Sequence, residues 1–156
     1  MQIRFRVSHS FKHSLHEKYS DFNQFELEFA LELDKAKKPW FRNPKQGCFS
    51  IPLLDKGDSN TFNPDFVVWA NKSIIAIDTK GDHLIKGDAS RKLFSLVKYG
   101  KGPNLFIKLV TKGEWSNEIK KIGTVGFTVW NIKNGRIVAH HARSLKDCIS
   151  LCLTVS

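Results

Sequence analysis

Residues 63–81 have the sequence NPDFVVWANKSIIAIDTKG and decide the expected fold. Two runs rich in β-branched and aromatic residues, 65–70 and 73–80, are separated by Asn71 and Lys72. This pattern predicts an antiparallel hairpin with a two-residue turn. Asn-Lys is a poorer turn sequence than Asn-Gly, and a longer loop would shift the pairing of the strands.

In the two-residue register, Asp65 lies opposite Asp78. Directly opposed residues have Cβ atoms about 4.5–5.5 Å apart, and two carboxylates at that distance resist ionising together unless a cation lies between them. Lys80 follows Asp78 by two positions and is expected on the same face of its strand. Such a set can bind a hard divalent ion, Mg²⁺ or Mn²⁺, and orient an attacking water. The alternative interpretation is a solvated strand end, because Asp-x-Lys alone is common.

A helix is predicted from about residue 22 to residue 36, with Asp21 and Gln24 as a capping box. Glu26 shares one face of this helix with four apolar residues, Phe22, Phe29, Ala30 and Leu33. A carboxylate on an apolar face needs a partner or a metal, which makes Glu26 the candidate third acid. Glu28 belongs to a charged stripe that is expected to face solvent.

The remaining elements follow from periodicity and turn signals. Strands are predicted at 49–53, 105–111, 126–132 and 136–139, with a hairpin turn at 133–135, and helices at 88–99, 117–121 and 145–153. His9, His13 and His16 have helical spacing, which indicates either a solvated helical face or a metal-binding one. This order of elements predicts an α/β sandwich around a mixed sheet.

Length and charge limit the classes of function. The 156 residues fit one domain, residues 1–156, and 41% hydrophobic and 26% charged residues argue against disorder. The net charge is +10, unevenly spread: residues 1–88 carry 13 basic and 12 acidic side chains, and residues 89–156 carry 12 and 3. The basic second part predicts a nucleic-acid-binding face. The alternative is a basic surface that serves only solubility.

No apolar run approaches the roughly 20 residues of a membrane helix, and the N-terminus lacks the apolar stretch of a secretory signal. The three cysteines are scattered, so we expect a reducing cytoplasm with neither disulfides nor a zinc cluster. Cys148 and Cys152 lie four residues apart in an apolar tail, which favours buried thiols. The four tryptophans are candidates for base stacking or, more simply, for core packing: Trp40, Trp69, Trp115 and Trp130.

The pair Pro64-Asp65, followed by Asp78-Thr79-Lys80, resembles the PD-(D/E)xK nuclease superfamily. More narrowly, the chain is similar to the C-terminal endonuclease domain of type III restriction enzymes (the Res subunit). The likeness covers roughly residues 22–98, through Glu26-x-x-Phe29-Ala30-x-x-Leu33-Asp34, Trp40-x-Arg42-Asn43, Ile51-Pro52, Asn63-Pro64-Asp65-Phe66 and Asp78-Thr79-Lys80-Gly81-x-x-Leu84.

The resemblance implies a restriction-endonuclease-like fold, a central mixed β-sheet flanked by helices, and Mg²⁺-dependent cleavage of DNA phosphodiester bonds. It implies that Asp65 and Asp78 are metal ligands, with the Thr79 carbonyl as a further one. Lys80 would position the water, and Glu26 would ligate the metal or its water. Many relatives have Glu at the position of Asp78, and the shorter side chain would alter the metal preference.

Other basic residues are candidates for phosphate binding. Lys92 follows Asp88 by four positions, as in the family's Asp-x-x-x-Lys, and could reach a phosphate. On or beside the same predicted helix, a phosphate track could be formed by Arg91, Lys98 and Lys101. The alternative interpretation is that Lys92 is an exposed lysine on the helix with no role in phosphate binding. Arg42 is expected to pair with an acid or a phosphate.

We therefore expect a Mg²⁺-dependent endodeoxyribonuclease that is part of, or derived from, a restriction system. Type III subunits carry an ATP-driven helicase motor upstream, so a motor domain or subunit is an expected partner, and the chain would be a fragment, a subunit or a free-standing nuclease. The alternatives are a structure-specific repair or recombination nuclease, an inactive DNA-binding module and a structural adaptor. A two-fold homodimer would suit the cutting of both strands.

Overall fold

A mixed β-sheet forms the centre of the computed structural model, which describes residues 8–44, 48–55, 58–80, 105–116, 121–133 and 136–154. The order of its six strands is β12-β11-β8-β7-β6-β3. Strands β7 and β8 run parallel, and the other described neighbours are antiparallel. The strands are β3 (Trp40–Arg42), β6 (Phe66–Ala70), β7 (Ser73–Lys80), β8 (Leu105–Lys112), β11 (Phe127–Lys133) and β12 (Arg136–Ala142). The expected α/β architecture with a mixed central sheet is confirmed.

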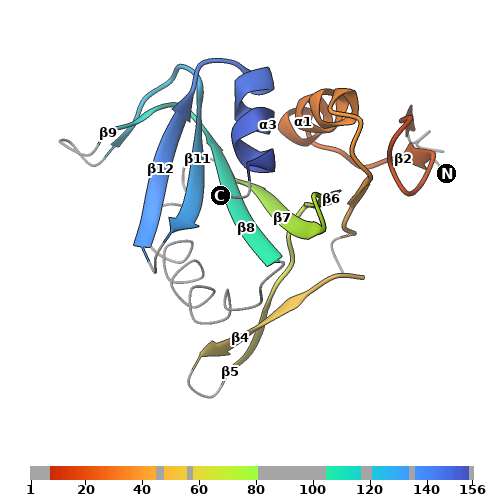
Figure 1. Cartoon of the computed structure of the whole chain (residues 1–156), viewed down its shortest axis with the longest axis horizontal. Helices are drawn as coiled ribbons and strands as arrows, with labels where there is room; N and C mark the ends of the chain where they lie inside the picture. The colour runs from red at the N-terminus through yellow and green to blue at the C-terminus, as the bar shows by residue number, and fades with distance from the viewer. Residues whose placement is uncertain are drawn as a thin grey trace, which may run out of the picture.

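Two helices, α1 (Gln24–Lys35) and α3 (Leu145–Leu153), lie side by side over one face of the sheet (Figure 1). We call this face the helix face. Its core is apolar and combines buried side chains from both helices and from the strands: Phe29, Ala30, Leu33, Cys148, Ile149, Cys152, Phe66, Val68, Ile75, Ile77, Val110 and Val129. The predicted burial of the two cysteines is confirmed. Helix α3 also has the predicted bounds.

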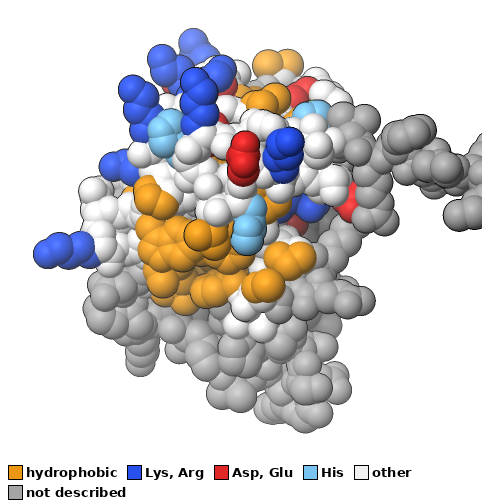
Figure 2. Space-filling view, turned by 90° about the vertical axis from the view of Figure 1, so that its right-hand side faces the viewer, with side chains coloured by type: hydrophobic (Ala, Val, Ile, Leu, Met, Phe, Trp, Pro, Cys, Tyr) orange, Lys and Arg blue, Asp and Glu red, His pale blue; other side chains and the backbone are white. Residues whose placement is uncertain are grey.

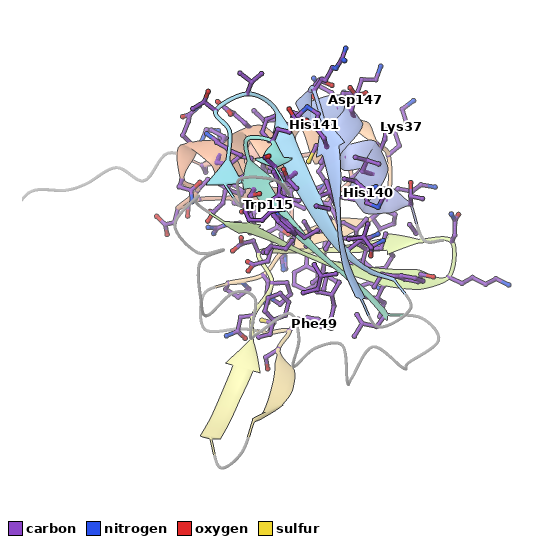
Figure 3. The ribbon with its side chains drawn as sticks, turned by 90° about the vertical axis from the view of Figure 1, so that its left-hand side faces the viewer. Lys37, Phe49, Trp115, His140, His141 and Asp147 are labelled. Carbon is purple, nitrogen blue, oxygen red and sulfur yellow. The ribbon has the colours of Figure 1, made fainter. Side chains whose placement is uncertain are left out.

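The other side of the sheet, here the distal face, carries a separate apolar cluster. Ala76 and Ile107 pack there with Phe62, and Phe49 contacts this cluster. Phe49 lies away from both helices (Figure 3). Strands β4 (Ile51–Asp55) and β5 (Asp58–Phe62) form a hairpin that extends from the sheet (Figure 1). Because side chains alternate along a strand, residues of β7 that share the parity of Ala76 belong to the distal face.

The hairpin of β6 and β7 has the predicted register. Val68 pairs with Ile75 and Ala70 with Ser73, which leaves Asn71 and Lys72 as the two turn residues. Both have positive φ, 50° and 63°, as a type I′ turn requires. A short tight turn therefore determines which residues stand opposite each other along the whole hairpin.

Helix α1 begins with a different cap from the predicted one. Asn23, not Asp21, is the N-cap: its side chain accepts a hydrogen bond from the Glu26 N–H at 2.8 Å, and its own N–H donates to Glu26 Oε2 at 3.3 Å. Asp21 lies in a left-handed conformation, with φ 62°, before the helix. The capping box is thus Asn23 and Glu26, and the expected pair Asp21 and Gln24 is wrong.

Residues 9–19 are not helical, contrary to the interpretation of the histidine spacing. Strands β1 (His9–Ser10) and β2 (Lys18–Tyr19) form a small antiparallel sheet. The N–H groups of Lys12 and His13 donate to the Asp34 carboxylate at 2.9 and 2.8 Å, and the Leu15 N–H donates to the Trp40 carbonyl at 2.7 Å. These bonds to distant residues replace the local bonds of a helix.

Several further elements were predicted. The hairpin of β11 and β12 is confirmed, with Lys133 opposite Arg136. The expected strand at 49–53 begins and ends two residues later, at β4. Part of the expected helix at 117–121 is strand, because Lys121 begins β10 (Lys121–Ile122), which pairs with β9 (Trp115–Ser116). Residues 117–120 and the expected helix at 88–99 lie outside the described residues. In the described part of the chain, no helix has the length and apolar character needed to cross a membrane.

Candidate active site

The two acids of the hairpin lie at the same end of adjacent strands. The last pair of the β6–β7 ladder is Phe66 with Ile77, and Asp65 and Asp78 are the next residues beyond it on each strand. Asp78 shares the parity of Ala76 on β7 and therefore belongs to the distal face. Its side chain is buried, at 1% exposure, and Asp65 is half-buried. The register on which the expected opposition of Asp65 and Asp78 rests is thus observed, and the ladder ends one pair before these two residues.

The Asp65 carboxylate is held by the residue that follows Asp78. Both the N–H and the hydroxyl of Thr79 donate to Asp65 Oδ2, at 2.8 and 2.7 Å. The main chain of Asp65 is fixed as well, since its carbonyl accepts the Asn43 N–H at 2.8 Å. Asp65 is therefore held both by β7, through Thr79, and by the segment that follows β3, through Asn43. The resemblance assigned to Thr79 only a carbonyl ligand, whereas Thr79 bonds to Asp65 through its N–H and its hydroxyl.

Asn43 was part of a motif but had no role in the sequence analysis. It is buried, at 5% exposure. Its side-chain Nδ2 donates to the Phe49 carbonyl at 2.7 Å, and its Oδ1 accepts the Phe49 N–H at 3.0 Å. One amide thus ties Phe49, from the distal cluster, to the segment that holds Asp65. Only the folded chain reveals this role, because no local pattern links residues 43 and 49.

Glu26 is buried on the helix, as predicted, and its partner is a cation. The Glu26 side chain is 11% exposed, and its Oε2 lies 2.7 Å from Arg42 Nη2. Glu26 Oε1 accepts from the Asn23 side chain at 2.9 Å. Arg42 also donates to the carbonyls of Ser20 and Asp21, at 3.2 and 2.8 Å. Of the two partners expected for Arg42, an acid or a phosphate, the structure shows an acid.

A continuous set of contacts joins this ion pair to the hairpin acids. Arg42 pairs with Phe66 across β3 and β6, and the residue before Phe66 is Asp65. Asn43, the residue after Arg42, donates its N–H to the Asp65 carbonyl. Glu26 and Asp65 are thus connected through two consecutive residues, Arg42 and Asn43. Among the described residues, however, there is no group of three His, Cys, Asp or Glu side chains placed to hold a metal ion.

The expected lysines and arginines are placed only in part. Lys80 is the last residue of β7, and its main chain pairs with Thr111 of β8; its side chain is outside the described part of the structure. Arg91, Lys92 and Lys98 lie in the segment 81–104, which is also outside it.

The basic second part of the chain is not uniformly exposed. Lys112, Arg143 and Lys146 are exposed. Lys108 is buried under α3, at 2% exposure, and its Nζ donates to the Thr154 carbonyl at 3.0 Å. Burial lowers the pKa of this lysine. Lys108 therefore adds to the net charge without contributing to a surface for DNA.

Comparison with known proteins gives one match. The model of the YagJ family matches residues 11–123. This range includes α1, the hairpin acids and strand β8. No curated protein matches the chain, and no solved structure matches it. Because the family model covers well over half of the sequence, the chain belongs to the YagJ family.

Proposed function

We propose that the chain is a Mg²⁺-dependent DNA endonuclease with a restriction-endonuclease-like fold, acting within or derived from a restriction system. The observation that carries the proposal is the Asn71-Lys72 turn, since its register makes Asp65 and Asp78 the first residues beyond the last pair of the hairpin ladder. The mixed sheet with helices on one face supports the proposed fold. The resemblance through the Asp78-Thr79-Lys80 motif supports the proposed chemistry.

The oxygen-rich end of the hairpin suits a hard divalent ion. Carboxylates and main-chain carbonyls are ligands that Mg²⁺ and Mn²⁺ accept, and two neighbouring carboxylates are stabilised together by a cation. Asp65, Asp78 and the Thr79 carbonyl would hold the ion. When bound, it would polarise the phosphoryl oxygen and lower the pKa of water.

The protein's own residues have separate parts in this proposal. Thr79 and Asn43 orient Asp65 through the bonds described above. Lys80 positions the attacking water. Glu26 remains the helix acid, and its ion pair with Arg42 fixes the orientation of both side chains. Arg42 is thereby a positioning residue for Glu26, in addition to any contact it makes with phosphate. Arg91, Lys92 and Lys98 are the proposed phosphate contacts.

Cleavage assays test the proposal directly. Linear, supercoiled and single-stranded DNA would each be incubated with the chain in Mg²⁺, Mn²⁺ or EDTA, with Lys80→Ala beside the wild type. Lys18→Ala, at an exposed position on β2, is the matched control. We expect metal-dependent cutting by the wild type and the control and none by Lys80→Ala. Cutting in EDTA, or undiminished cutting by Lys80→Ala, would contradict the mechanism.

Binding in EDTA separates the nuclease from an inactive DNA-binding module. If lysines and arginines displace phosphate counterions, the logarithm of the binding constant falls linearly with the logarithm of the salt concentration. Salt-dependent binding without cutting under any metal condition would favour the inactive module. Binding that does not depend on salt would contradict the basic DNA-binding face.

A further inference from the structure

One tryptophan of the described chain remains open to solvent on the sheet. Trp40 is fully buried, Trp130 is 8% exposed and Trp115 is half-buried, but Trp69 on β6 is 39% exposed. The Trp69 ring packs beside the half-buried Phe41 ring of β3, with centroids 5.6 Å apart and an interplanar angle of 35°. Two aromatic rings therefore lie together at the edge of the sheet. Figure 2 shows that hydrophobic side chains gather into a patch on one side of the molecule.

These rings lie on the same face of the sheet as the buried acid. Trp69 alternates with the core residue Val68, which places it on the distal face. In the ladder Trp69 pairs with Ile74, and Asp78 follows Ile74 by four positions of β7 with the same parity. Four residues of strand span roughly 13 Å. The aromatic pair thus lies on the same face as Asp78, with the buried Ala76 of the distal cluster between them along β7.

Basic residues lie close to the aromatic pair along the chain. The Trp69 N–H donates to the Pro39 carbonyl at 2.9 Å, so the segment that carries Lys37 and Lys38 runs beside Trp69. Lys37 is exposed and lies on the side of the molecule where the helices are, away from Phe49 (Figure 3). Lys72, in the turn three residues after Trp69, is exposed too. Aromatic rings between positive charges are the combination that binds single-stranded nucleic acids.

We propose that Trp69 and Phe41 form a stacking platform for unpaired bases of DNA, with Lys38 and Lys72 contacting the phosphates. The platform deepens the proposed function and rests on it, because it names single-stranded DNA as the substrate class delivered to the Asp65 and Asp78 site. Bases in a duplex stack on one another, so only an unpaired base offers its face to a protein ring. A protein partner fits less well, since lysine is depleted at protein interfaces.

Binding measured in EDTA tests the platform without requiring cleavage. The probe is a short fluorescein-labelled oligodeoxythymidylate, followed by anisotropy, with a duplex of equal length for comparison. Trp69→Ala should weaken binding of the single strand about tenfold, the effect of losing one stacked base. Trp69→Phe should restore most of it. Leu31→Ala, at an exposed apolar position on α1, is the control and should bind as the wild type does.

Trp69→Leu distinguishes the loss of stacking from a general loss of structure. Leucine keeps the apolar bulk but has no aromatic face, so it should bind the single strand as weakly as alanine while its melting temperature stays near that of the wild type. Single-strand binding by Trp69→Leu or Trp69→Ala equal to the wild type would overturn the platform. An equal loss of duplex binding would overturn its selectivity for unpaired bases, and tighter binding of oligouridylate would overturn the assignment to DNA.

The two proposals fail separately. If the wild type cuts DNA but the Trp69 variants bind normally, the nuclease stands and the platform does not. If no condition gives cleavage but the Trp69 variants lose single-strand binding, the platform stands and the nuclease does not. Loss of self-association in Trp69→Ala, with unchanged oligonucleotide binding, would instead assign this patch to a second copy of the chain and overturn the platform.

Discussion

Thr79 donates two hydrogen bonds, from its N–H and its hydroxyl, to the same oxygen of Asp65, at 2.8 and 2.7 Å. The two residues lie on opposite strands of the hairpin, just where its ladder of main-chain pairs ends. These bonds join the two strands beyond the last main-chain pair, and the acceptor is a carboxylate oxygen instead of a main-chain carbonyl. The residue between Asp78 and Lys80 in the motif therefore sets the direction of the other acid.

The Thr79 hydroxyl can be removed while its shape is retained. Thr79→Val keeps the N–H bond to Asp65 but loses the hydroxyl bond, and a hydrogen bond to a charged group contributes about 2 kcal/mol. We expect a loss of that size in the free energy of unfolding, measured with urea, and about tenfold slower single-turnover cleavage. Thr79→Ser should behave as the wild type. A valine variant with unchanged stability and cleavage would show that the hydroxyl bond contributes nothing.

Asp78→Asn removes one of the two neighbouring carboxylates with little change in volume. We expect cleavage to be abolished and DNA binding to survive, because the metal loses a ligand while the basic surface is unaltered. The wild type should melt at a higher temperature in Mg²⁺ than in EDTA, since an ion that binds only the folded state stabilises it. Asp78→Asn should lose most of that difference.

The exposed acid of α3 provides the control for the Asp78 experiment. Asp147→Asn should keep both the cleavage activity and the response of the melting temperature to Mg²⁺. If Asp78→Asn retains Mg²⁺-dependent cutting, Asp78 has no part in the mechanism. An unchanged response of its melting temperature would remove Asp78 from the metal site.

The two glutamates of α1 should respond differently to amide substitution. Glu26→Gln leaves the largely buried Arg42 without its ion pair, and breaking such a pair costs about 2 kcal/mol or more. Glu28 is exposed and bonds to Gln24, so Glu28→Gln should stay within about 0.5 kcal/mol of the wild type. Activity should fall in the same order. The reverse order, in urea unfolding or in cleavage, would mean that the inward helix face does not supply the functional acid.

Asp34 should make the stability of the fold depend on pH. Burial by itself raises the pKa of Asp34, but hydrogen bonds from the Lys12 and His13 N–H groups and from Trp40 outweigh it and hold the pKa below its ordinary value of 3.8. Because the folded-state pKa is lowered, the stabilising contribution is present above 3.8 and is lost as the pH falls through the folded-state value.

Thermal melting across pH measures this contribution. Asp34→Asn should melt below the wild type at neutral pH, and the difference should shrink as the pH falls below 3.8. Asp147→Asn, again the exposed control, should show no comparable change. A difference between Asp34→Asn and the wild type that is the same at all pH values would show that the charge of Asp34 does not stabilise the fold.

Local patterns were sufficient for much of the architecture. The spacing of apolar residues predicted α1 with Glu26 on its buried face, and the Asn71-Lys72 turn predicted the β6–β7 register. Both predictions depend on residues close in sequence, where 3.6-residue and two-residue periodicity decide which side chains share a face. The observed capping box, Asn23-x-x-Glu26, is also a local pattern, but Asp21 with Gln24 has the same spacing and was preferred.

Contacts between distant segments were decided by the tertiary structure. Arg42 pairs with Glu26, which is sixteen residues away in the sequence. The Asp34 carboxylate accepts the N–H groups of residues 12 and 13, and these bonds replace those of the expected helix. The four tryptophans also have similar apolar neighbours in the sequence but differ in exposure. Trp69 lies on the distal face at the edge of the sheet and is exposed, whereas Trp40 packs against α1 in the core. The sequence alone determined periodicity and turn geometry, since these are local. Which charge, ring or amide meets which partner required the folded chain, because such pairings depend on how helices and strands pack against one another.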